Sequence, residues 1–475
     1  MLPGKLKKLR ERFFPIYRSE AKKFVPLLFI KLCLSFAYTV LHATKDTLIV
    51  TAKGSGAETI PILKGWFVLF FAFLFLLIYS KVSNHLSKSS LFYCTFLPFI
   101  FFFALYGFLL YPNRDLLIPH QSADRLLSFL GPERTHWVAV YRYWMDSIFF
   151  LMAELWGGVV IALSFWGFAN RINSHSEASR FYTLFSAGGH VGVIIAGPLI
   201  WHFARINSEF SLTIKYLTGT IVLICFLVMA IFWWMDRTII KTNEAFSKEK
   251  RPNLSLKDSL KHLIRSPSLG CIALMVIGYS ISVNMIEVIW KATLKLQYPT
   301  PHEYEAFMGL LTSVIGALSL FLALGGGYII RKFGWYVGAL STPIVLGCAS
   351  ILFLTVFFSN IQGSGALSFL IFIGAVHNIS CKSMKYCLFD PTREMAYISL
   401  DTEIQVKGKA AIDVVASRFG KSGSSWLQTL FMELAGVSSV LSIAPFLTPI
   451  VLAAVLCWII AISYLHQKRL QSQTN

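Results

Sequence analysis

The feature that most constrains this chain is a series of long apolar segments that recurs along its whole length. A helix of about 20 residues crosses the ~30 Å hydrocarbon core of a bilayer, so each such segment predicts a membrane-spanning helix. Twelve can be counted, at approximately 25–44, 61–80, 91–111, 137–169, 181–203, 216–235, 269–290, 306–330, 335–358, 365–381, 410–432 and 440–465. The fourth is too long for one upright span, and we expect it to tilt or to extend beyond the bilayer.

The composition excludes most other classes of protein. Only 14% of the residues are charged and 55% are hydrophobic, whereas ordinary soluble domains are about 25% charged. A net charge of +19 would suggest nucleic acid as a partner in a soluble protein. Here most basic residues lie in loops between apolar segments, so membrane topology explains them and we expect no nucleic-acid binding. The eight cysteines form no Cys-x-x-Cys pair, so neither a metal site nor a cofactor is predicted. No cleavable signal peptide is recognisable.

Lysine and arginine in the short loops predict the orientation. They are concentrated before the first segment and after the second, fourth, sixth, eighth and twelfth segments. All these loops fall on one side, which should be the cytoplasm, together with both chain ends. The expected divisions are a basic N-terminus at 1–24, a six-helix half at 25–236, a basic linker at 237–267, a second six-helix half at 268–466 and a tail at 467–475.

The two halves show weak internal symmetry. GGYIIRKFGW (326–335) and IYSKVSNHLSKSSLF (78–92) occupy matching places, each with a polar or small-residue helix end, a basic turn and a new apolar helix. Two parallel six-helix repeats are typical of major-facilitator-like transporters, whose substrate binds at the midplane between the halves. The predicted fold is therefore an all-α membrane protein of twelve transmembrane helices in two six-helix halves.

Several polar and charged residues stand inside the apolar segments, where they are costly and indicate function. The candidate substrate-binding residues chosen on this ground are Lys45, Lys64, Glu154, Asn284, Glu287, Lys385 and Lys421. Others noted are Lys31, Asp46, Arg142, Asp146, Lys291, Lys382 and Arg418. Cations are in excess, so a central cavity would attract a small, strongly anionic solute such as a nucleotide or a sugar phosphate. Glu154 and Glu287 could set the local field, bind a hydroxyl or amino group, or carry a proton.

Helical spacing relates some of these residues. Asn284 and Glu287 share one helix face with Lys291. Arg142 and Asp146 are four residues apart, so the alternative that they only neutralise each other stays open.

The stretch RFGKSGSS (418–425) contains Gly-Lys-Ser, the end of a phosphate-binding loop. That loop needs Gly-x-x-x-x-Gly-Lys-Ser, and Val415 stands where its first glycine belongs. No soluble strand precedes it. We therefore expect no ATPase or other enzyme, and assign Lys421 the role of a simple cation that contacts phosphate.

A set of motifs resembles the ADP/ATP translocases of plastids and obligate intracellular bacteria. They include KDTLIVTAKGSGAETIPILK (45–64), AELWGGVV (153–160), NMIEVIWK (284–291), EYEAFMG (303–309), DPTREMAYI (390–398) and VKGKAAIDVVASRFGKSG (406–423), in order along the chain. The resemblance implies twelve helices and a counter-exchange or import of nucleotides. The positions important in that family fall on Lys64, Glu154, Glu287 and Lys421, all with their charge type kept.

Several departures from the family pattern surround the expected site, at 42–43, 196–200, 377–378 and 424–426, and they leave the substrate and the coupling mode open. Exchangers of this family typically carry Arg-Asp where this chain has His42-Ala43. Three hypotheses stay open: ATP/ADP exchange by alternating access; import of nucleoside triphosphates with protons, carried by Glu154 or Glu287 with help from His42 or His377; and a nucleotide-binding sensor without flux, whose basic segments would bind anionic lipid. A monomer in a bacterial inner membrane or a plastid-type membrane is expected.

Overall fold

The computed structural model describes residues 16–17, 19–240, 266–359, 365–397, 412 and 416–474, and every regular element within these ranges is helical. The long helices of the first half are α2 (Ala21–Thr51), α4 (Leu69–His85), α5 (Lys88–Leu105), α9 (Trp144–Trp156), α11 (His175–Ile206) and α12 (Phe210–Met235). Its short helices are α3 (Thr59–Ile62), α6 (Arg114–Leu117), α7 (His120–Leu130), α8 (Thr135–Arg142) and α10 (Trp166–Ile172). Those of the second half are α14 (Pro267–Gln297), α15 (Pro301–Phe358), α16 (Ala366–Met384), α17 (Asp390–Tyr397), α19 (Ser417–Ala435) and α20 (Ala444–Thr474).

Several spans continue through π-helical turns, which widen the helix by one residue. These are η1 (Leu63–Val68), η2 (Tyr106–Leu110), η4 (Gly157–Phe165), η5 (Asp236–Ile240) and η7 (Lys385–Phe389), and a short 3₁₀ turn, η3 (Pro132–Arg134), precedes α8. Such turns often mark functional sites, and three of them, η1, η4 and η7, adjoin or contain candidate residues.

Eleven helices in the described part are long and apolar enough to cross a membrane. Two of them lie within α15, which is interrupted at Gly334. The φ of Gly334 is 84°, a backbone conformation that residues other than glycine rarely adopt. The eleventh expected segment, 410–432, corresponds to α19, which is not among these eleven. This helix is less apolar because several of its buried residues are polar, among them Ser424, Ser425 and Gln428. The start of that segment, and most of the basic linker, lie outside the described residues.

The fourth apolar segment is not one helix. The backbone breaks at Tyr143, which separates α8 from α9. The proposed pairing of Arg142 with Asp146 is wrong for this reason. Arg142 instead contacts the Asp124 carboxylate, and the Tyr106 hydroxyl donates to Asp146 at 2.6 Å.

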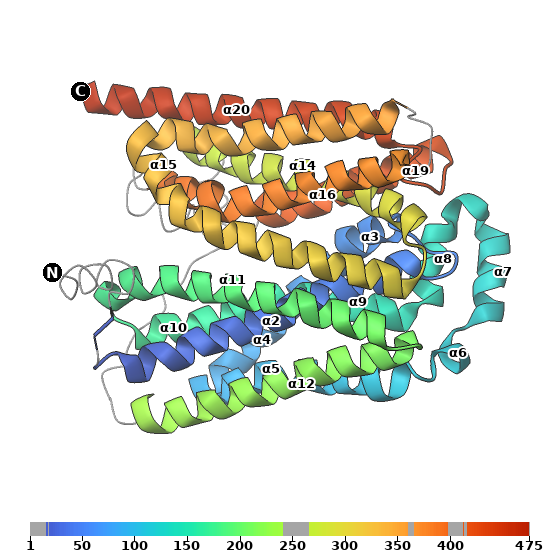
Figure 1. Cartoon of the computed structure of the whole chain (residues 1–475), viewed down its shortest axis with the longest axis horizontal. Coiled ribbons are helices and arrows are strands. Elements are labelled where there is room, and N and C mark those ends of the chain that lie inside the picture. Colours follow the sequence, from blue (N-terminus) through green and yellow to red (C-terminus); the bar gives the residue numbers. More distant parts are fainter. Residues whose placement is uncertain are drawn as a thin grey trace.

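The two sets of helices form two bodies side by side (Figure 1). Helices from the first half, blue to green, fill most of the lower part, and those from the second half, yellow to red, fill the upper part. The start of α2 and the end of α20 lie at the same end of the molecule, on the left of the view. We call this the terminal end, and the opposite one the far end.

The far end is held closed across the halves by one carboxylate. Glu433 of α19 accepts from Arg134 Nε at 3.1 Å and from Trp137 Nε1 at 2.8 Å. His136 lies 3.9 Å from the same carboxylate, and burial lowers the pKa of its imidazole. Lys295 adds a second link by donating to the Ser55 carbonyl.

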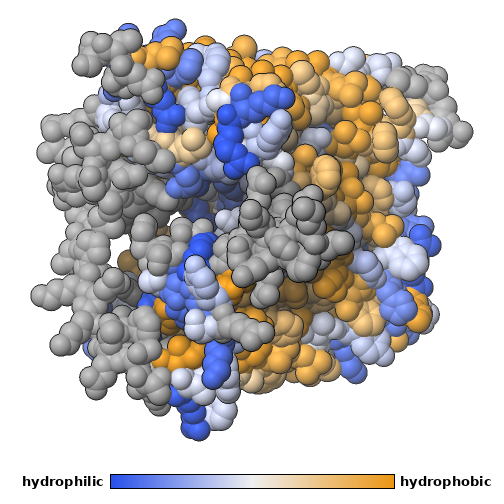
Figure 2. All heavy atoms as spheres, turned by 60° about the vertical axis from the view of Figure 1, so that its left-hand side comes forward, coloured by the Kyte–Doolittle hydropathy of each residue, from blue (hydrophilic) through white to orange (hydrophobic). Residues whose placement is uncertain are grey.

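The terminal end differs. Figure 2 turns it forward and shows the surface hollowed between the upper and lower bodies, with hydrophilic side chains beside the hollow. The far end therefore has direct contacts between the halves, and the surface of the terminal end is hollowed between them.

Close glycine packing joins the halves between α11 and α15. A Cβ on Gly197 would lie 2.3 Å from the Gly309 carbonyl oxygen and 2.0 Å from the Ser313 hydroxyl oxygen. A Cβ on Gly309 would lie 2.9 Å from the Gly197 carbonyl oxygen. The two backbones therefore approach closely at these glycines, with the Ser313 and Ile200 side chains packed around the contact.

We predict that Gly197→Ala lowers the thermal unfolding temperature of the detergent-solubilised protein, because the added methyl overpacks this contact by about 1–3 kcal/mol. Gly270→Ala in α14 is the matched control, since nothing lies within 4 Å of its added Cβ. It should be neutral or stabilising, because alanine favours helix over glycine by about 1 kcal/mol. Equal unfolding temperatures for the two variants would contradict the packing argument.

Candidate functional site

The end of α2 supplies two adjacent charged residues that are almost fully buried. The Lys45 ammonium lies 2.7 Å from Asp46 Oδ1 and 3.2 Å from Glu154 Oε1 on α9. The Lys45 side chain is 1% exposed and also lies over the Phe150 ring. Two carboxylates therefore neutralise Lys45 within the protein.

The second half supplies the rest of the charged network. Lys291 of α14 lies 2.8 Å from Asp46 Oδ2, across the boundary between the halves, and 3.3 Å from Glu287 on its own helix. Glu287 in turn lies 3.2 Å from Lys382 of α16. The result is a continuous chain of alternating sign, which we call the charge chain: Glu154, Lys45, Asp46, Lys291, Glu287 and Lys382.

The charge chain has three carboxylates and three ammonium groups, so its formal charges cancel. Buried charges are tolerated only when they are paired, because removing them from water costs several kcal/mol each. Each internal member of the chain has a neighbour of opposite sign on both sides. The chain therefore lets six charges sit between the halves without a net charge of its own.

Two candidate cations are left outside this balance. Within the described residues neither Lys64 nor Lys421 forms an ion pair with a carboxylate. The Lys64 ammonium donates only to the Asn284 side-chain oxygen, at 3.3 Å. Lys421 is exposed despite lying in the interior helix α19.

The elements that bear these two lysines are packed together. Trp426 Nε1 of α19 donates to the Gly65 carbonyl of η1 at 3.0 Å, next to Lys64. A Cβ on Gly65 would meet the side chains of Trp426 and Ser425 at 3.0–3.2 Å. This close approach places one unneutralised cation from each half on contacting elements, beside a chain that is already neutral.

Lys385 lies apart from this group. Its ammonium pairs with Asp390 at 2.7 Å and lies over the Tyr386 ring. The other six candidates, Lys45, Lys64, Glu154, Asn284, Glu287 and Lys421, belong to the charge chain or to the elements around Lys64 and Lys421.

Sequence reasoning missed one buried carboxyl. Glu305 of α15 is fully buried, and its Oε1 accepts from the Thr44 hydroxyl, next to Lys45, at 2.8 Å. The eighth apolar segment, as predicted from the sequence, begins at residue 306, so Glu305 lies just outside it. A helix boundary one turn earlier would have found it.

The Gly-Lys-Ser stretch is helical. Residues 418–425 lie within α19, so they form no phosphate-binding loop. Val415 lies outside the described residues. No group of three or more potential metal ligands occurs in the described part of the chain.

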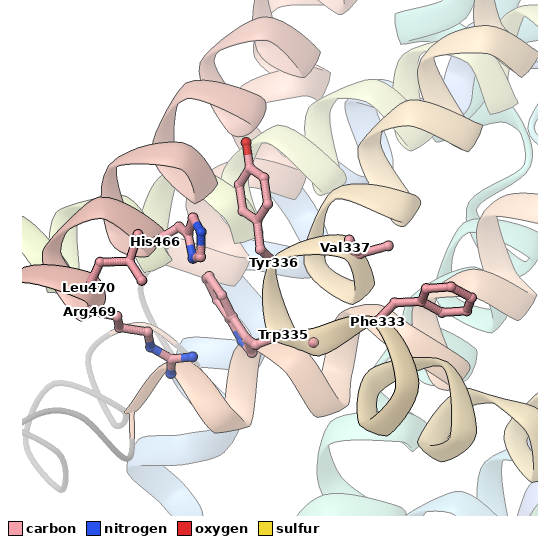
Figure 3. A pocket seen from close by; sticks show the side chains of 8 residues that line it. Phe333, Trp335, Tyr336, Val337, His466, Arg469 and Leu470 are labelled. Atoms are coloured by element: carbon pink, nitrogen blue, oxygen red, sulfur yellow. The ribbon is translucent and has the colours of Figure 1, made fainter. Parts of the chain in front are cut away.

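A surface pocket at the terminal end is a separate feature (Figure 3). It lies beside the Gly334 turn and the end of α20, where Arg469 stacks 4.1 Å from the Trp335 ring and Tyr336 stacks on His466. None of the candidate residues lines it.

Comparisons with known proteins agree with this architecture. A family model described as "TLC ATP/ADP transporter" matches residues 3–469. The chain is 42% identical over 482 residues to "ADP,ATP carrier protein 1" of Chlamydia muridarum, which covers 97% of this chain and 91% of the relative. It is 39% identical over 483 residues to "ADP,ATP carrier protein 1, chloroplastic" of Arabidopsis thaliana, covering 98% and 76% respectively. It is 35% identical over 496 residues to "ADP,ATP carrier protein 4" of Rickettsia bellii, covering 98% and 94%.

Solved structures share the fold at low sequence identity. A D-xylose–proton symporter superposes with a TM-score of 0.57 at 11% identity, covering 94% of this chain and 96% of that one. A bacterial homologue of the iron transporter ferroportin, in an inward-facing state, gives 0.59 at 14% identity, covering 94% and 98%. The predicted all-α, major-facilitator-like fold is thereby confirmed.

We predict that Asp46→Asn strongly destabilises the protein, because it leaves Lys45 and Lys291 short of a shared buried partner. Breaking a buried ion pair costs about 3–5 kcal/mol, which should appear as a large fall in thermal unfolding temperature in detergent. Asp115→Asn is the control, since Asp115 is 91% exposed in its pair with Arg114 and should change little. The double variant Asp46→Asn with Lys291→Met should recover part of the loss, and no recovery would argue against direct coupling.

Proposed function

The chain belongs to the TLC ATP/ADP transporter family, and we propose from this premise that it exchanges ATP for ADP across a membrane by alternating access. The observation that carries the proposal is the pair of unneutralised lysines, Lys64 and Lys421, on contacting elements of opposite halves. A polyphosphate brings the negative charge that they lack.

Lys64 and Lys421 would bind the phosphates from the two sides. Both are point-like ammonium donors, and charge-assisted bonds to phosphate are among the strongest available to a side chain. Because each half contributes one cation, the bound phosphate neutralises both halves together. An empty site keeps two uncompensated positive charges, so its closure is unfavourable, and return of the transporter requires a second anion. This is the physical basis of exchange.

The charge chain supports this cycle. Glu154 and Glu287 hold Lys45, Lys291 and Lys382 in place while nucleotide is absent, and they can release them toward phosphate when it binds. The Asp46–Lys291 contact crosses the halves, so rocking of the halves must lengthen or exchange it. ATP carries one more negative charge than ADP, so exchange without a co-ion moves charge, worth about 2.3 kcal/mol per 100 mV.

Proton-coupled import of nucleoside triphosphates is the second candidate. Glu154 or Glu287 would carry the proton. Of the two histidines considered as helpers, His42 packs against Tyr38 with ring centroids 4.2 Å apart, and His377 is buried beside Ser350 and Cys381. A sensor that binds nucleotide without flux is the remote alternative.

The location and assembly are proposed on the same basis. The chain is a multi-pass membrane protein, and we place it in a bacterial inner membrane or a plastid-type membrane. The basic loops support a cytoplasmic terminal end, so the hollowed surface would face the cytoplasm. We expect it to act as a monomer within the lipid bilayer.

Reconstituted protein distinguishes these mechanisms. Proteoliposomes loaded with ADP should take up labelled ATP much faster than empty ones, because return of the transporter needs an anion. Uptake that is indifferent to internal ADP but abolished by a protonophore would instead establish proton-coupled import. Nucleotide binding with no uptake under either condition would establish a sensor.

We predict that Lys64→Gln and Lys421→Gln each weaken ATP binding about tenfold or more, since a hydrogen bond to a charged group contributes about 1.5–3 kcal/mol. Binding of ATP to the solubilised protein is the measurement. Lys215→Gln is the control, because Lys215 is exposed on α12 over the Phe108 ring, far along the chain from either lysine. Unchanged affinity in both site variants would remove the basis of the proposal.

A further inference from the structure

One face of α2 carries a polar stripe from the terminal end to the charge chain. The stripe consists of Lys31, Ser35, Tyr38, His42 and Lys45, at successive spacings of four, three, four and three residues. At about 3.6 residues per turn these spacings keep all five on one side of the helix. The deepest member, Lys45, contacts Glu154 and Asp46 in the charge chain. The outermost member, Lys31, therefore lies on the same face, about 21 Å nearer the terminal end.

The outermost lysine is directed into protein. Its ammonium lies 5.8 Å from the centroid of the Phe165 ring and 5.9 Å from that of Trp166. Gly189 of α11 approaches so closely that a Cβ there would lie 3.8 Å from the ammonium nitrogen. Among the described residues no carboxylate and no hydrogen-bond acceptor contacts it. A lysine that merely reached for lipid headgroups would not be enclosed by three elements of its own half.

This position adjoins the boundary between the halves. His190, the residue after Gly189, lies with its ring 5.3 Å from that of Tyr386 in η7 of the second half. Tyr386 is partly exposed, and Trp166 is half-buried. The ammonium of Lys31 thus lies beside the Phe165 and Trp166 rings of the first half, and Tyr386 of the second half contacts the residue that follows Gly189.

A second cation without an acidic partner stands between the two levels. Arg418 lies one helical turn before Lys421 on α19, and its guanidinium would be 3.5 Å from a Cβ on Gly158 of η4. It too lacks an ion pair or hydrogen bond with any described residue. Four cations without a carboxylate partner among the described residues therefore follow one another from the terminal end inward: Lys31, Arg418, Lys421 and Lys64.

We propose that Lys31 and Arg418 form an outer binding station for nucleoside polyphosphates, which holds the phosphates near the mouth before they reach Lys64 and Lys421. This inference rests on the proposed function. Among the described residues neither outer cation has an acidic partner, and a row of like charges in a low-dielectric channel focuses the field and raises the local concentration of an anion. Trp166 and Tyr386 offer flat apolar surface for the base. The station captures the ligand, and the inner lysines bind it for transport.

The test compares variants at two ionic strengths in proteoliposomes that exchange labelled ATP for ADP. K31Q and R418Q should each raise the KM for ATP about threefold or more at low salt, because electrostatic capture is lost. The ratio to wild type should fall toward one as salt is raised. The increase should be larger for ATP than for ADP, which carries less charge, and K31R should restore most of the wild-type KM.

K22Q is the matched control. It removes the same charge from the same helix, but nine residues away, which is half a turn off and so on the opposite face, and Lys22 is exposed. A salt-independent defect in K31Q that K31R fails to rescue overturns the station, because it indicates a packing role. A K31Q variant equal to K22Q at both salts also overturns it. Failure of the wild-type protein to exchange ATP for ADP overturns the proposed function, whereas wild-type exchange with an unaltered K31Q overturns only the station.

Discussion

The free-energy cost of removing charged side chains from water determines which charged residues can lie between the two halves of this protein. Six ionised groups lie between the two halves, and each is tolerated because its neighbours in the charge chain carry the opposite sign. The Asp46–Lys291 contact is the point where the chain crosses from one half to the other. Apolar packing alone would hold two helical bundles together in any register, whereas alternating charges are satisfied in only one. The chain therefore fixes how the halves meet in the described state.

The same principle separates residues that hold the fold from residues that await a ligand. Lys45 and Lys291 are neutralised within the protein, so a newly bound anion must compete with carboxylates for them. Among the described residues no carboxylate pairs with Lys64 or Lys421, so an anion can bind these two lysines without that competition. Being buried and cationic is therefore a weaker sign of a binding residue than being cationic and unneutralised.

Much of the fold and part of the site follow from the sequence. The apolar segments predicted the spans, because the thickness of a bilayer imposes a length that can be counted. The charged residues inside those segments supplied the candidate residues, because lipid tolerates such groups poorly, and the structure brings six of the seven close to one another. The ion-pair partners of these residues could not be predicted from the sequence. The contact between Lys291 and Asp46 depends on how α14 packs on α2, and no local sequence pattern determines that packing. The break at Tyr143 and the polar character of α19 were obscured for a related reason, since tertiary contacts there override the apolar pattern. Glu305 was lost through a boundary error of one turn.

The contact between Gly197 and Gly309 bears on movement. Helices usually interlock through ridges of side chains set into grooves, and sliding them requires those ridges to climb over one another. At Gly197 and Gly309 no such ridges are present and the two backbones meet directly, but the Ser313 hydroxyl beside them donates to the Ile194 carbonyl of α11 at 3.0 Å. Movement of α15 along α11 therefore requires this hydrogen bond to break and the Ile200 side chain, which would lie 2.9 Å from a Cβ on Gly309, to shift. The glycines thus reduce the number of side chains that such a movement displaces, while the hydrogen bond fixes the register from which it starts.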